Sequence, residues 1–89
     1  MNDNTTRLEI KLQNASDIRS LVYAASDFNV SGSIEGNRSK VSIASILGLF
    51  TLDMTQPHII RVAQIENSRV DEFVEALREK NIDIQPVSV

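Results

Sequence analysis

The chain contains no cysteine and no tryptophan, and its 89 residues include only two prolines, three glycines and one histidine. Without cysteine it has no disulfide bond, no thiolate nucleophile and no zinc–cysteine site. This composition agrees with a cytoplasmic location, which we expect. No apolar run approaches the roughly 20 residues that a membrane-spanning helix needs, and the first residues lack a signal-peptide pattern. The sequence therefore predicts no membrane partner.

Basic residues are also few: nine Lys and Arg stand against twelve Asp and Glu, for a net charge of −3. Proteins that bind nucleic acid use clustered basic side chains to meet phosphates, and those that bind single strands add aromatic stacking platforms. With three Phe and one Tyr such platforms are scarce, so we expect no nucleic-acid partner. The 42% hydrophobic content is that of a globular protein. A chain of this length holds one core, and residues 1–89 are expected to form a single domain.

Apolar and polar residues alternate in four segments that read as half-buried strands: 8–12, 30–35, 40–43 and 58–63. The second and third flank Gly36-Asn37, a pair suited to a hairpin turn. The tail 82–89 alternates too. It is either an added edge strand, within the molecule or across a dimer, or a frayed, disordered terminus.

Three segments read as helices, each preceded by a capping residue. Asn14 caps the first, with Asp17 as reciprocal partner of a capping box. Ser45 caps a short apolar helix from Ile46 to about Met54, and Ser68 with Asp71 opens the last. We expect Leu49 and Leu52 of the short helix to face the core. Four more residues form the apolar stripe of the last helix: Val70, Phe73, Val74 and Leu77.

The element order is βαββαβα, and strands that alternate on one side only predict an α+β fold with an antiparallel sheet and helices on one face. A ferredoxin-like βαββαβ domain shares most of this order.

Two stretches of the sequence resemble a known family. Ser45-Ile46-Leu47-Gly48 is similar to the Ser-Ile-Met-Gly signature of HPr, the histidine-containing phosphocarrier of the bacterial sugar phosphotransferase system. Ala25-Ser26-Asp27-Phe28 resembles that family's Ala-Ser-Lys-Phe/Tyr, at the family's separation from the first stretch. The resemblance implies the HPr-like open-faced β-sandwich. It also implies that Ser45 is a regulatory phosphorylation site and that Ile46, Leu47 and Phe50 bind a partner.

The family's active loop, Gly-Ile/Leu-His-Ala-Arg-Pro, has no counterpart here. A gapless register puts Asn14 in the place of the histidine, and Ser16 and Asp17 in the places of Arg and Pro. A register shifted by a shortened loop puts Asp17 in the place of the histidine and Arg19 in that of the arginine. Neither supplies an imidazole, so the loop is degenerate and we expect no catalytic residue. In the HPr layout His58 lies far from this loop, and we expect a turn or strand-edge histidine.

No residue set predicts a metal site or a cofactor. Four acidic residues near the C-terminus are read as the solvated face of the last helix: Asp71, Glu72, Glu75 and Glu79.

Ser45 has two compatible interpretations. As a helix cap its hydroxyl is worth about 1 kcal/mol; as a kinase target, its phosphate would lie against the same helix amides.

The sequence thus predicts a non-catalytic HPr-like regulatory or protein-binding module of the bacterial cytoplasm, not an enzyme. Its expected partner is a transcription regulator, a component of the phosphotransferase system, or a second copy of itself. The alternatives are a phosphocarrier component with a displaced acceptor and a ferredoxin-like small-molecule-binding regulatory domain.

Overall fold

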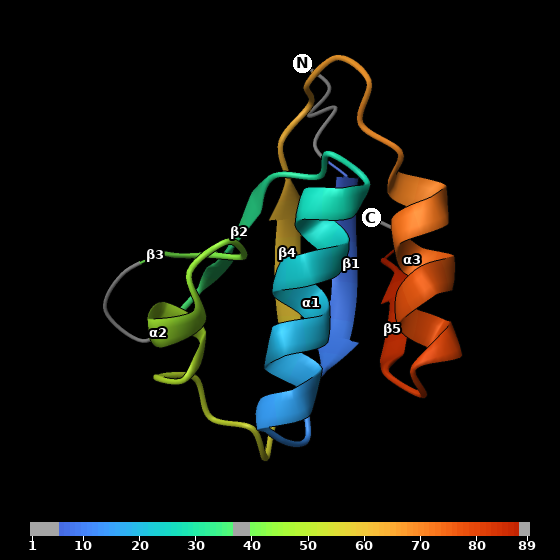
Figure 1. Ribbon diagram of the computed structural model, residues 1–89. Helices are drawn as coiled ribbons and strands as arrows, with labels where there is room; N and C mark the ends of the chain where they lie inside the picture. The colour runs from blue at the N-terminus through green and yellow to red at the C-terminus, as the bar shows by residue number, and fades with distance from the viewer. Residues whose placement is uncertain (1–5, 37–39, 88–89) are drawn as a thin grey trace.

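The computed structural model describes residues 6–36 and 40–87 (Figure 1). These residues form five strands and three helices in the order β1 (Thr6–Lys11), α1 (Ala15–Asp27), β2 (Gly32–Glu35), β3 (Lys40–Ser42), α2 (Ile46–Leu49), β4 (His58–Val62), α3 (Val70–Glu79) and β5 (Asp83–Pro86). The strands make one antiparallel sheet in the order β3-β2-β4-β1-β5. Of the predicted hairpin turn, Asn37 lies outside the described residues, as do Ser88 and Val89 of the tail.

The helices cover one face of this sheet, as the single-sided alternation of the strands predicted. Figure 1 shows α1 and α3 side by side in front of the sheet, with α2 on the other flank of α1. Side chains at alternate strand positions, such as Leu8, Ile10 and Ile60, are buried beneath the helices. Arg7 and Glu9 belong to the alternate set on the open face. The small α+β fold with an open antiparallel sheet is confirmed.

The chain path interlocks two βαβ units. β1 and β2 each run antiparallel to β4, which lies between them, so they are parallel to each other and joined by α1. In the same way β4 and β5 flank β1 and are joined by α3. Each is a split βαβ unit. β3 and α2 are inserted between β2 and β4, and β5 extends the predicted order by one strand.

Of the alternatives predicted for the tail, the structure shows an edge strand within the molecule: β5 pairs with β1, and Ile84 is buried opposite Ile10. Val87 donates its N–H to the Arg7 carbonyl, so the alternate residues Ile84 and Pro86 turn their main-chain groups outward. Pro86 has no N–H to offer, and the Nε of Arg78 already donates to the Ile84 carbonyl at 3.1 Å. This edge is therefore poorly suited to pairing across a dimer.

Both long helices end in the same way. Asn29 and Asn81 follow the last residues of α1 and α3 and adopt left-handed backbone angles, with φ of 56° and 64°. In each case the next residue, Val30 or Ile82, is buried and donates its N–H to a carbonyl five residues earlier. These are Schellman motifs, in which asparagine takes the position that glycine usually occupies.

Two predicted helix boundaries were wrong. α3 begins after Arg69 with no side-chain cap, so the expected box of Ser68 and Asp71 does not form, and the Ser68 hydroxyl is buried without a hydrogen-bond partner. Arg69 instead donates from its own N–H to the Phe28 carbonyl and from its guanidinium to the Asp27 carbonyl at 3.1 Å. Anchoring α3 to the end of α1 in this way fixes its start.

The other wrong boundary is the end of α2, which stops at Leu49 rather than near Met54. The N–H groups of Thr51 and Leu52 donate to carbonyls three residues earlier, and the Thr51 hydroxyl also donates to the Gly48 carbonyl at 2.6 Å. This tighter turn ends the α-helix. Leu52 still reaches the core and, like Leu49, is buried as expected.

Candidate functional site

The start of α1, where the resemblance places the degenerate loop, is built from carboxylate and amide oxygens. Asn14 caps the helix, its Oδ1 accepting from the Asp17 N–H at 3.0 Å. The Asp17 carboxylate accepts from the N–H of Gln13 at 2.9 Å, rather than from the cap residue itself as the predicted box requires. Ser16 is exposed in the same turn. The cap is confirmed, and side chains of this chain already satisfy one N–H group of the first turn, that of Asp17, and the N–H of Gln13 just before the helix.

His58 lies at the same end of the sheet as this loop. It begins β4 opposite Ile10, so it is nearer to the start of α1 than the resemblance implied. Its Nε2 is 2.8 Å from the carbonyl oxygen of Asp53. Because a carbonyl oxygen only accepts, Nε2 is the donor in this contact. The histidine is at a strand end, as predicted, and its hydrogen bond to Asp53 stabilises the preceding turn.

Further hydrogen bonds stabilise that turn, residues 50–57. The Asp53 carboxylate accepts from the hydroxyl and the N–H of Thr55, at 2.6 and 2.9 Å. These two hydrogen bonds, helped by the positive charge of His58 and Lys11, lower the pKa of Asp53 below its ordinary value. The Nζ of Lys11 donates to the Met54 carbonyl at 3.0 Å. Asp53 and Asp17 therefore place two carboxylates at the end of the sheet where α1 begins.

The resemblance's second site, around Ser45, has the predicted local geometry. The Ser45 Oγ accepts from the Gly48 N–H at 3.1 Å and caps α2. Gly48 packs so closely that an added Cβ would lie 2.9 Å from the Val41 side chain and 3.0 Å from the Ser45 hydroxyl. The cap interpretation of Ser45 is confirmed.

We expect Ser45→Ala to lower the free energy of unfolding by about 1 kcal/mol, because the Gly48 N–H loses its acceptor. Ser45→Asp should stay within about 0.5 kcal/mol of the parent, since a carboxylate also caps and suits the positive end of a helix. Urea unfolding of the three proteins measures both. Identical midpoints for the alanine variant and the parent would show that the hydroxyl is not the cap.

The three expected partner-binding residues divide into two exposed and one that is not. Leu47 is 83% exposed and Phe50 is 45% exposed, whereas Ile46 is half-buried and packs against the core. Ile46 is only partly exposed because the side of α2 that carries Leu49 inward turns Ile46 partly inward as well, and its role in partner binding stays a prediction. We define the α2 surface as Leu47 and Phe50.

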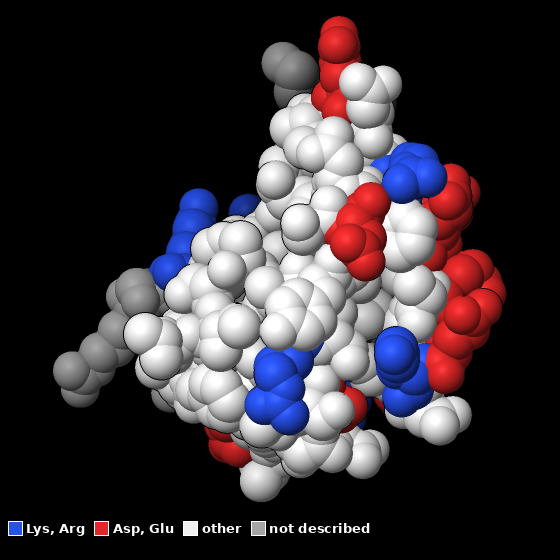
Figure 2. Space-filling model, viewed as in Figure 1, with Lys and Arg blue, Asp and Glu red and all other residues white. Residues whose placement is uncertain are grey.

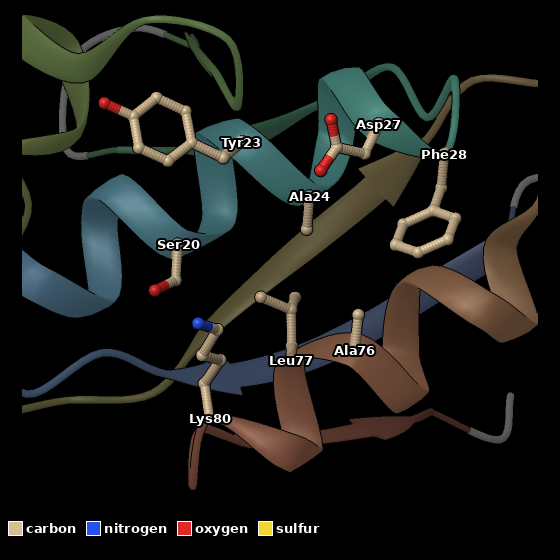
Figure 3. Close-up of a pocket in the computed structure, with 8 residues that line it drawn as sticks. All are labelled: Ser20, Tyr23, Ala24, Asp27, Phe28, Ala76, Leu77 and Lys80. Atoms are coloured by element: carbon tan, nitrogen blue, oxygen red, sulfur yellow. The ribbon is translucent and has the colours of Figure 1, made fainter.

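A third exposed apolar side chain on the helical layer was missed. Tyr23 of α1 is 60% exposed, and its ring points away from α3 (Figure 3). In Figure 2 the face over α1 and α2 carries few charged side chains, whereas acidic side chains gather over α3. The acidic residues there are those expected to form a solvated helix face, and all four are exposed. Tyr23 had a sequence signal, since it stands outside the helical spacing of the buried α1 residues Ile18, Leu21 and Ala25.

Within the described ranges 6–36 and 40–87, no three acidic or histidine side chains converge as metal ligands would, and none of the helices is long and apolar enough to cross a bilayer. No family model, no curated protein and no solved structure matches this sequence.

Proposed function

We propose that this chain is a non-catalytic, HPr-like protein-binding module of the bacterial cytoplasm that docks its partner on the α2 surface. The observation that carries the proposal is the exposure of Leu47, 83% in a four-residue helix otherwise anchored by Ser45 and the buried Leu49. Leu47 and the neighbouring Phe50 both expose apolar surface to water, and a partner that covers them removes this surface from water, which favours binding.

The resemblance supports the same assignment. The order of the first seven elements is that of the HPr family, and Ser45 stands at the start of α2 with its side chain half-exposed. A phosphate on Ser45 would add negative charge beside the docking residues and next to the first N–H groups of α2. Modification there would alter partner affinity without any change of fold.

The proposed partner is a regulator or phosphotransferase component with an apolar pocket for Leu47, or a second copy of the chain. Self-association through this surface would be separate from the β5 edge, where Pro86 and Arg78 oppose strand addition.

The test replaces Leu47 by Asp. Because Leu47 is exposed, the variant should stay within about 0.5 kcal/mol of the parent in unfolding free energy yet bind its partner at least tenfold more weakly, since a carboxylate would have to be buried. Sedimentation detects self-association, and pull-down followed by titration with the retrieved protein detects a partner. Ile65→Asp is a matched control, because Ile65 is also exposed (41%) but lies after β4, away from α2. Equal binding by Leu47→Asp and the parent would refute the docking surface.

A phosphocarrier with a displaced acceptor is the second candidate, because His58 lies at the end of the sheet where α1 begins. A phosphate on His58 would be repelled by the carboxylates of Asp53 and Asp17, which lie at the same end of the sheet, so we expect no transfer. Incubation with phosphoenolpyruvate and the first enzyme of the sugar system should leave the protein without acid-labile phosphate. Stoichiometric labelling that is lost in His58→Gln would establish the phosphocarrier instead.

A further inference from the structure

A hollow of about 280 Å³ lies between α1 and α3, on the flank of α1 away from the α2 surface (Figure 3). Its floor consists of Ala24 and Leu77, both buried, and Ala76 continues it on α3. The hollow exists because small side chains face each other where two helices pack, leaving space that larger residues would fill. Its size is close to the lower end of small-molecule sites, roughly 300 Å³.

The two ends of the hollow carry opposite charges. Lys80 extends from the end of α3 toward the half-buried Ser20 of α1, and Figure 3 shows their polar atoms at the same end. Asp27 lines the other end, beside the ring of Phe28. In the described part of the chain these three polar side chains have no hydrogen-bond or ion-pair partner, although Lys11, Arg69 and Arg78 are each engaged.

The placement of Asp27 indicates what belongs at its end. It stands in the last turn of α1, where the helix dipole is negative and a carboxylate is unfavourable, and that turn contains no basic residue. Arg69 reaches the main-chain carbonyl of Asp27, yet no ion pair joins it to the carboxylate; its partner carboxylate is Glu72. The Arg69 guanidinium thus meets the end of the helix but not the Asp27 carboxylate, and an ammonium group here would offset the charge of that carboxylate.

We propose that the hollow binds a short peptide with free termini, its carboxylate at Lys80 and Ser20, its ammonium at Asp27, and one apolar side chain over Ala24 and Leu77. The length follows from the helix. Asp27 lies seven positions after Ser20, and a rise of 1.5 Å per position spans roughly 10 Å, the length of about three extended residues. A tripeptide therefore reaches both charges, whereas a single amino acid reaches one.

The hollow is open to solvent and small, so the expected affinity is low, with a dissociation constant of about 0.1–1 mM. The probe is the tripeptide alanyl-leucyl-alanine, titrated into ¹⁵N-labelled full-length protein. We expect amide shifts in the second half of α1 and in α3, and at least fivefold weaker binding of the C-terminally amidated and N-acetylated forms, each of which removes one charge. Shifts confined to α2 or to the open face of the sheet, or none up to 10 mM peptide, would overturn the proposal.

Two variants assign the direction of the peptide. Lys80→Met should weaken binding of the free-acid peptide about fivefold but leave binding of the amidated peptide unchanged, because the amide has already lost the charge that Lys80 meets. Asp27→Asn should likewise weaken binding of the peptide with a free amino end and leave binding of the N-acetylated peptide unchanged. Lys40→Met makes the same change on β3 and should have no effect. If Lys80→Met weakens binding of both peptides equally, the Lys80 ammonium does not bind the peptide carboxylate and the assignment fails. Because these residues lie outside the α2 surface, the result is independent of the Leu47→Asp test.

Discussion

Leu49→Ala should lower the free energy of unfolding by about 2–5 kcal/mol, whereas Leu47→Ala, two residues away, should change it by about 0.5 kcal/mol or less. Leu49 is fully buried and Leu47 is 83% exposed, although both belong to the same four-residue helix. Truncation of Leu49 removes its transfer free energy and leaves a cavity, because the surrounding core relaxes only in part. Truncation of Leu47 removes contacts mainly with water.

Urea unfolding of the parent and the two variants measures the difference, and the slope of each transition shows whether both remain two-state. The comparison also tests the docking proposal, which requires that α2 present Leu47 outward. Similar losses for the two variants would mean that both side chains are core, and the α2 surface would not exist. Leu52→Ala is a useful reference, because Leu52 is buried just beyond the helix and should resemble Leu49.

The arrangement of strands and helices on one face of the sheet was predictable from periodicity, because burial on a single face leaves alternate strand positions and one helix stripe apolar. Phe73, Val74 and Leu77 are buried as their spacing predicted. The caps at Asn14 and Ser45 were predictable as well, since each depends on a hydrogen bond to a residue only three positions away.

The boundaries that depend on distant residues could not be predicted in this way. α3 begins at Val70 because Arg69 binds the end of α1, some 40 positions earlier, and the favourable local sequence at Ser68 is overridden. Two helix ends did have a local signal. Asn29 and Asn81 each precede a buried aliphatic residue, which is a pattern typical of the Schellman motif.

The candidate sites divide in the same manner. The α2 surface could be predicted from the sequence because a four-residue helix cannot bury every large apolar side chain, although which of them faces outward depends on the packing of α2. The hollow between α1 and α3 could not be predicted, because Ser20 and Lys80 come together only when α3 packs beside α1. Its one local hint is the pair of alanines, Ala24 and Ala76, at positions where the two helices face each other.

The other large effect is expected at Gly32, which begins β2 beside β4. A Cβ added there would lie 2.5 Å from the Arg61 carbonyl oxygen and 3.2 Å from the Val62 Cα. Both are main-chain atoms of a central strand, so no side chain can rotate to make room, and β2 must move away from β4. That movement strains the pairing of Gly32 with Val62 and the 2.8 Å hydrogen bond from the Ala63 N–H to the Ser31 carbonyl.

We therefore expect Gly32→Ala to lower the free energy of unfolding by about 3 kcal/mol, at the upper end of the range for overpacking. Gly48→Ala is the matched control: its added Cβ would lie 2.9 Å from a Val41 methyl and 3.0 Å from the Ser45 hydroxyl, which are side-chain atoms that can shift. We expect it to cost less, about 1–2 kcal/mol. Hydrogen exchange should show faster opening of β2 and β3 in Gly32→Ala than in Gly48→Ala, because only the first separates these strands from β4. If the Gly32→Ala protein is as stable as the parent, β2 lies farther from β4 than described. Because β2 joins β3 to the rest of the sheet, the five-strand arrangement would then be wrong as well.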